Sequence, residues 1–64
     1  MWTAIYVAIG IENALDVEKK LKNEGFLIKK RLFSLEGEDE LYEIIAPEFE
    51  VEEIQEAMLE LGII

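Results

Sequence analysis

The chain opens on an apolar run, WTAIYVAI at residues 2–9, in which Thr3 is the only polar residue and after which Gly10 follows. A short apolar run rich in β-branched and aromatic residues and closed by glycine is typical of a buried β-strand. Alternation along the strand predicts two faces. One face holds Thr3, Ile5, Val7 and Ile9, and the other holds Trp2, Ala4, Tyr6 and Ala8. A strand that is apolar on both faces usually has both covered, which raises the question of what covers the second face.

Two later segments place apolar side chains at helical spacing. The first begins between residues 11 and 13 and carries Ala14, Val17 and Leu21 on its apolar side. The second runs from about residue 48 to residue 61, and its apolar side holds Val51, Ile54, Ala57, Met58 and Leu61. Gly25 and Gly62 follow the two segments, so we expect both helices to end in Schellman motifs, with Phe26 folded onto Leu21 and Ile63 onto Met58.

Two further strands are predicted at roughly residues 26–33 and 40–46, with a turn around Glu36 and Gly37 between them and Pro47 after the second. A right-handed crossover from the first strand to the second leaves a gap that the third strand fills. We therefore expect a single α+β domain over residues 1–64, a ferredoxin-like βαββα unit with a three-stranded antiparallel sheet in the order 1-3-2. Both helices would cover one face, and the fourth strand of that plan is missing or vestigial.

Charged residues in the predicted hairpin bear on its register. Lys29 and Arg31 share one face, where Glu43 of the next strand can pair with them. Lys30 instead shares the face of apolar residues that point to the helices. It either reaches out at the margin of the sheet or marks a bulge that shifts the register, and the sequence leaves both open.

The small size of the chain limits its stability. At 64 residues there is room for one thin core, which is marginal unless disulfides, a metal or other subunits brace it. The chain has no cysteine and no histidine, which removes disulfides and nearly all zinc, haem and iron–sulfur chemistry. We expect no cofactor and no metal, and oligomerisation is the brace that remains.

The outer edge of the first strand is the predicted assembly surface. It has no charged residue to discourage pairing, whereas the second strand carries a basic run at residues 29–31. An unguarded edge beside Trp2 and Tyr6 on the open face marks an interaction site. The expected interface with further copies of the chain is centred on Trp2, Ile5, Tyr6 and Val7. Assembly would use the edge, the open face or both; the alternative is a monomer in which residues 63–64 cap the edge.

The net charge of −9 is unevenly distributed. All six cations lie between residues 19 and 31, whereas residues 32–64 carry eleven carboxylates and no cation. Such a surface repels nucleic acid and anionic membranes. Carboxylates on the second predicted helix would meet a basic protein partner or simply remain solvated: Glu52, Glu53, Glu56 and Glu60.

The sequence offers little for catalysis. The only serine, Ser34, falls in a predicted turn and has no histidine as base, and a lone glycine between strand and helix is a weak phosphate-loop signal. No signal peptide is visible, and no apolar run is long enough to span a membrane. We therefore expect a cytoplasmic protein that is not an enzyme.

Three segments together resemble a known family. The opening MWTAIYVAI, the helix end VEKKLKNEGFLIK and the closing YEIIAPEFEVEEIQEAMLEL resemble small bacterial proteins described as prokaryotic signal-transducing proteins, a family of unknown function with a GlnB-like, ferredoxin-type half fold. The resemblance covers nearly all of the chain, and its motifs are structural. It implies a regulatory or adaptor role, which favours a non-enzymatic, homo-oligomeric interaction module.

A second resemblance supplies the alternative function. The βαββα order, the glycine after the first strand and the ELG near the end of the second helix resemble ACT-type ligand-sensing domains, which bind amino acids between subunits. That resemblance implies a small-molecule site at the turn formed by Gly10, Ile11, Glu12 and Asn13. The turn, IGIENA at residues 9–14, lacks the proline usual in that family, and the fourth strand is missing.

Overall fold

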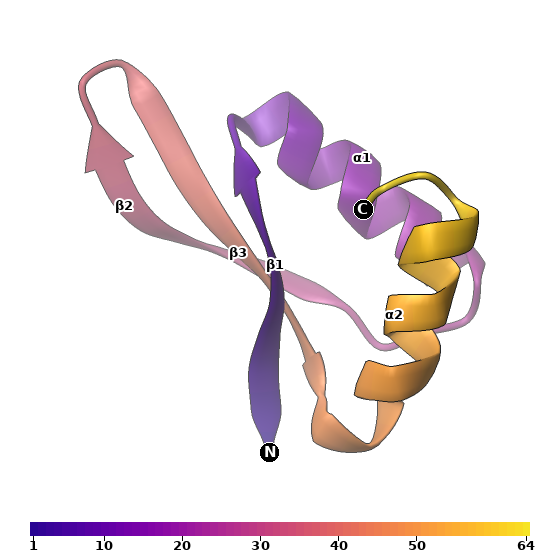
Figure 1. Ribbon diagram of the computed structural model, residues 1–64. Helices are drawn as coiled ribbons and strands as arrows, with labels where there is room; N and C mark the ends of the chain where they lie inside the picture. Colours follow the sequence, from indigo (N-terminus) through magenta and orange to yellow (C-terminus); the bar gives the residue numbers. More distant parts are fainter.

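The elements follow one another as strand, helix, strand, strand and helix. The structure, a computed structural model, describes the backbone of residues 1–64 and every side chain except that of Glu36. Its elements are β1 (Trp2–Ile9), α1 (Ile11–Asn23), β2 (Lys29–Glu36), β3 (Asp39–Pro47), the short 3-10 helix η1 (Glu48–Glu50) and α2 (Val51–Glu60). The strands form one antiparallel sheet in the order β1-β3-β2, and both helices lie on the same side of it (Figure 1). The predicted α+β, ferredoxin-like half fold is confirmed.

The ends of both helices are set by glycine. At the end of α1, the Phe26 N–H donates to the carbonyl of Leu21 at 3.3 Å and the Gly25 N–H donates to that of Lys22 at 2.9 Å. These are the two hydrogen bonds of a Schellman motif. Gly25 has a φ of 95°, a left-handed conformation that residues with a Cβ adopt only at a cost. α2 ends with the same pair of bonds around Gly62, so both predicted endings are confirmed.

β1 pairs with β3 in two blocks separated by a β-bulge. The first block ends at Ala4 and the second begins at Tyr6, so Ile5 is the extra residue. An extra residue reverses the alternation of the side chains that follow it. Tyr6 therefore lies opposite the fully buried Ile44 and packs against the core on the helix side. The predicted position of Tyr6 beside Trp2 on the open face is wrong.

β2 begins at Lys29, later than predicted, because the backbone before it is bound elsewhere. The Phe26 N–H closes α1, and the Leu27 N–H donates to Oε1 of Glu50 in η1 at 2.9 Å. These donors are thus occupied outside the sheet. The segment forms a connection from α1 rather than the first part of a strand.

A second bulge lies in β2, where the pairing with β3 shifts between Leu32 and Ser34. Ser34 thus belongs to the strand, not to the predicted turn, and the hairpin turns at Gly37 and Glu38. In Figure 1 the tip of this hairpin extends beyond the helices. The predicted order of the hairpin is correct, but its first strand lies three residues later than expected and its second strand is longer than expected.

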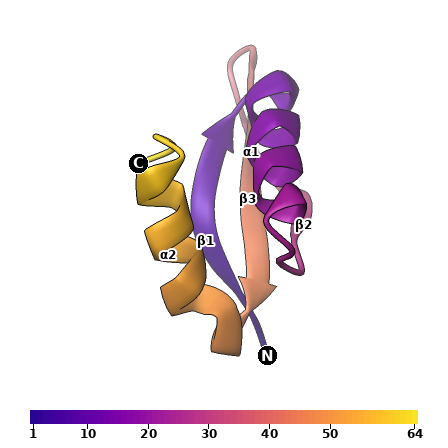
Figure 2. The same cartoon turned by 90° about the vertical axis from the view of Figure 1, so that its right-hand side faces the viewer.

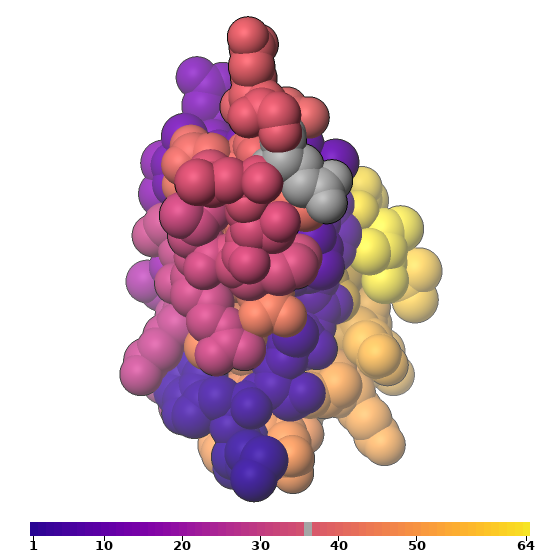
Figure 3. Space-filling model, turned by 90° about the vertical axis from the view of Figure 1, so that its left-hand side faces the viewer, coloured from indigo at the N-terminus to yellow at the C-terminus, as the bar shows by residue number. Residues whose placement is uncertain are grey.

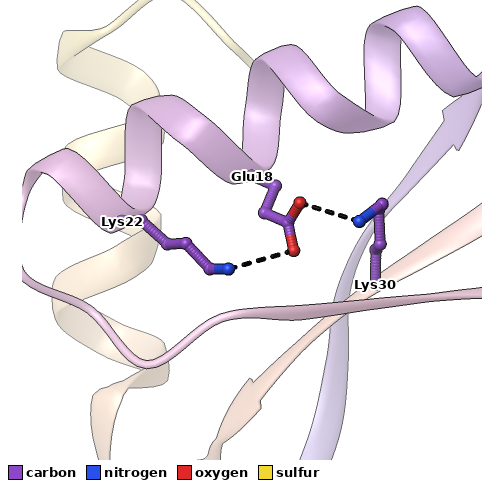
Figure 4. A network of polar contacts seen from close by, with 3 residues as sticks. All are labelled: Glu18, Lys22 and Lys30. Atoms are coloured by element: carbon purple, nitrogen blue, oxygen red, sulfur yellow. Dashed lines mark hydrogen bonds and ion pairs between the residues drawn. The ribbon is translucent and has the colours of Figure 1, made fainter.

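Lys30 lies before that bulge and stays on the helix side of β2, opposite Ile44. Its Nζ donates to Oε1 of Glu18 on α1 at 2.9 Å, and Nζ of Lys22 lies 3.4 Å from the other oxygen of the same carboxylate (Figure 4). The Lys30 side chain remains 28% exposed, so its charge is neutralised at the margin of the core. A shift of register at Lys30 is not needed to place it.

The core lies between the sheet and the two helices. Its largest fully buried side chains are Leu21 of α1, Ile44 of β3, and Ile54 and Met58 of α2. Burial of each stabilises the fold by roughly 1.5–3 kcal/mol. The helices cover one side of the sheet only (Figure 2), so the core is one-sided and small.

Candidate interaction surface

The side of the sheet opposite the helices has no covering layer; Figure 3 looks towards it. Partners in an antiparallel pair share a face, so the register identifies the side chains on this side. We call them the open face: Trp2, Ala4, Val7, Ile9, Lys29, Arg31, Ser34, Asp39, Leu41, Glu43, Ile45 and Pro47. All three strands contribute to the open face, and β1 supplies its most apolar part.

One end of the open face is covered by a contact between its own side chains. The Nζ of Lys29 lies 4.5 Å from the centre of the Trp2 ring, a cation–π contact typically worth about 0.5–1 kcal/mol at an exposed site. Trp2 and Lys29 come from the strands on either side of β3, so their contact crosses β3. Ile45 lies between these strands and is only 8% exposed. The two side chains thus shelter Ile45 where no helix does.

At the other end of the open face the apolar side chains of β1 are exposed to solvent. Val7 is 49% exposed and Ile9 is 61% exposed. On the neighbouring strands, Nε of Arg31 donates to Oε1 of Glu43 at 2.8 Å, which confirms the predicted cross-strand pair. The charged side chains of this face therefore neutralise one another in part, while the apolar side chains of β1 meet solvent.

The outer edge of β1 has no neighbouring strand. In the described sheet β1 lies at one edge and pairs with β3 alone. The N–H groups of Ile63 and Ile64 donate to the carbonyl of Met58 at 2.8 and 3.4 Å. The residues after α2 therefore bond to that helix instead of extending along β1, and the edge keeps its free backbone groups.

The predicted interface residues separate into two groups. Trp2 and Val7 lie on the open face, whereas Ile5 and Tyr6 are partly buried against the core. Sequence reasoning missed Ile9, which is the most exposed large apolar side chain of β1. After Thr3 this run is apolar, so no polar residue marks where the alternation reverses, and the bulge had no signal in the sequence.

The predicted acidic helix is α2, and its carboxylates Glu52, Glu53, Glu56 and Glu60 are exposed. The ion pairs found among the described side chains join Asp16, Glu18 and Glu43 to cations, and none includes α2. The described residues also contain no group of three or more side chains placed to hold a metal ion. These carboxylates lie on the helix side of the molecule, away from the open face.

The turn predicted as a ligand site is tied into the fold. Gly10 has a φ of 86°, and its N–H donates to the carbonyl of Glu40 at 2.7 Å. Its carbonyl accepts the Ala14 N–H at 3.1 Å, and α1 begins at Ile11. Ile11, Glu12 and Asn13 are exposed. Glu12 lies in the first turn of α1, where a negative charge interacts favourably with the helix dipole.

The chain matches none of the protein-family models, curated proteins or solved structures with which it was compared. In the part of the chain that the structure describes, no helix combines the length and the apolar character needed to cross a membrane. Membership of the signal-transducing family and likeness to ACT-type domains both stay predictions.

Proposed function

We propose that this chain is a cytoplasmic, non-enzymatic interaction module that works as a homo-oligomer, in a regulatory or adaptor role. The observation that carries the proposal is the exposure of β1. Its outer edge has no neighbouring strand, and Trp2, Val7 and Ile9 on its open side are at least 40% exposed. An exposed apolar patch beside a free strand edge is typical of a protein–protein contact.

The number of exposed apolar side chains, compared with the number of buried ones, supports the same proposal. More large apolar side chains are exposed in this structure than are buried, and the core is confined to one side of the sheet. Burial of apolar surface stabilises by about 25 cal/mol per Å². A second copy that covers β1 would extend the apolar core beyond what one copy can build.

Sedimentation equilibrium at micromolar and higher concentrations tests this proposal. We expect a reversible, concentration-dependent shift from the mass of one chain to that of a dimer or larger assembly. A single species with the mass of one chain over the whole concentration range would contradict it.

The regulatory part of the proposal concerns a second partner. The exposed carboxylates of α2 lie outside the assembly surface and favour a basic protein. If that role is correct, a partner captured by the wild-type chain is lost when Glu52, Glu56 and Glu60 are all changed to glutamine, while self-association remains. Equal capture by both forms would count against the role of α2.

A thermal-shift screen against metabolites distinguishes a metabolite sensor from an interaction module. A ligand that binds only the folded state raises the melting temperature as its concentration increases. Such a rise with an amino acid, lost on a Glu12→Lys change at the predicted turn, would favour a sensor over an interaction module.

A further inference from the structure

We propose that two copies of the chain pack open face against open face, with their helices on the outside. The inference rests on the proposed homo-oligomer and specifies which of its two free surfaces is used. The alternative is edge pairing, in which β1 of one copy continues the sheet of the other. Four features of the structure favour the open face.

The first feature is the position of α2. Figure 2 shows α2 beyond β1, on the side away from β3, so that it lies over the place that a further strand would occupy. Neighbouring strands are about 4.8 Å apart, whereas packed helices need about 8–10 Å between their axes. Edge pairing about a twofold axis would place the α2 helices of both copies on the same side of the joined sheet, above the same pair of edge strands. The two helices would then compete for the same space.

The second feature is the charge of that helix. Glu52, Glu53, Glu56 and Glu60 are exposed on α2, and no ion pair among the described side chains neutralises them. Edge pairing would place two such helices side by side, where like charges repel. Packing through the open face leaves α2 of each copy on the outside, with both sheets between the two helices.

The third feature is the character of the open face itself. Its described charged side chains are Lys29, Arg31, Asp39 and Glu43, two of each sign, in a chain whose net charge is −9. Arg31 and Glu43 are already paired, and Lys29 lies on the Trp2 ring. Two open faces can therefore meet without bringing carboxylate-rich surfaces together.

The bulge in β1 also disfavours pairing at the edge of this strand. Because Ile5 interrupts the pairing with β3, the regular part of β1 that remains is short. A bulge also increases the local twist of an edge strand, which hinders pairing with another strand. The exposed side chains Val7 and Ile9 remain available to a facing sheet, since packing between faces needs no free backbone groups.

The size of the face predicts a reversible dimer. Three strands about 4.8 Å apart, with a rise of about 3.3 Å per residue, present a face of roughly 400 Å². Stable interfaces usually bury about 800 Å² from each partner. Because this face is about half that size, we expect a weak, reversible equilibrium between monomer and dimer rather than a permanent assembly.

A matched pair of lysine substitutions tests the face. Val7→Lys places a charge on the open face opposite Glu43, where lysine can pair within its own sheet, and Leu59→Lys replaces an apolar side chain on α2 that is 64% exposed. In sedimentation equilibrium we expect Val7→Lys to weaken dimerisation about tenfold or more, because a charge that replaces an apolar contact must lose water when the interface forms. Leu59→Lys should leave it nearly unchanged. Ile9→Lys serves as the second face variant if Val7→Lys unfolds.

Two further readouts separate the outcomes. Trp2 is the only tryptophan, so face packing should shift its emission to shorter wavelength as the dimer forms, whereas edge pairing would instead slow amide exchange along β1. Absence of any dimer in the wild type would overturn the proposed function together with this inference. A dimer that survives both face variants, with newly protected β1 amides, would overturn the inference and leave the proposed function standing.

Discussion

Glu18 links α1 to β2 through an ion pair. Its side chain is 12% exposed and meets Lys30 at 2.9 Å and Lys22 at 3.4 Å. Burial alone would raise the pKa of this carboxyl group, but the hydrogen bonds and charges of Lys30 and Lys22 outweigh it, and the pKa is lowered from its usual 4.5. The ionised form is therefore favoured more strongly in the folded chain than in the unfolded one.

Replacing Glu18 with glutamine should lower the free energy of unfolding at pH 7 by about 1–2 kcal/mol, because the partly buried amine of Lys30 loses its charged partner. The pH dependence has a definite sign. Since folding lowers this pKa, the stabilisation is fully present above the unfolded pKa and is lost as pH falls through the folded pKa. In urea denaturation, the difference between wild type and Glu18→Gln should therefore be largest at neutral pH and shrink at pH values below 4.5.

Asp16 provides the control. It pairs with Lys20 at 3.1 Å, but both side chains are about half exposed, at 57% and 45%. Pairs of this kind on a helix contribute about 0.3–0.5 kcal/mol, so Asp16→Asn should cost much less than Glu18→Gln. Equal losses for the two variants, or a Glu18→Gln difference that persists unchanged into acid, would show that the pairing with Lys30 is not the source of the stability.

The predictability of each element depended on whether its ends carry a local signal. Both helices were predicted from apolar spacing and a following glycine, since Gly25 and Gly62 supply the left-handed residue that the motif needs. The strand order followed from the crossover rule. The bulge at Ile5 did not follow, because its neighbours are apolar on both faces. The bulge at Phe33 lies three residues beyond Lys30, the position at which the sequence left a shift of register open. The open face was expected to be uncovered, but this reversal changed which residues belong to it.

α2 is the element with the clearest unfavourable local interaction. Glu52, Glu56 and Glu60 follow one another at i, i+4 spacing, and all are exposed. Like charges at this spacing destabilise a helix by about 0.2–0.5 kcal/mol for each pair. Glu56→Lys removes two repulsions and creates two attractions of similar size, so we expect thermal unfolding to show an increase in stability of about 0.8–2 kcal/mol.

The control for this change is Gln55→Lys, on the same exposed stretch of α2. It adds a positive charge but removes no repulsion, and its one acidic neighbour at helical spacing is Glu52 at i−3, so it can form at most a single ion pair. If both variants stabilise α2 equally, the gain comes from the reduced net charge of the molecule and not from repulsion within the helix.

For the whole molecule, the decisive property is the separation of charge from apolar surface. The cations lie within residues 19–31, and several of them form ion pairs with Asp16, Glu18 or Glu43. The excess carboxylates remain on the helix side and along the later part of the chain, whereas the open face is nearly balanced. Two copies of a chain with a net charge of −9 repel at long range, and the attraction between their open faces is apolar.

Dimerisation should therefore strengthen as salt is added. Raising sodium chloride from about 0.02 M to about 0.5 M shortens the Debye length from roughly 20 Å to under 5 Å, so the repulsion is screened while apolar burial is not weakened. Sedimentation equilibrium should show a tighter dimer at the higher salt, and the wild type should gain more than a form in which Glu52, Glu56 and Glu60 are glutamine. Association that weakens with salt would instead indicate an interface held by ion pairs, such as acidic α2 of one copy against the basic residues of another, and that arrangement is incompatible with two open faces in contact.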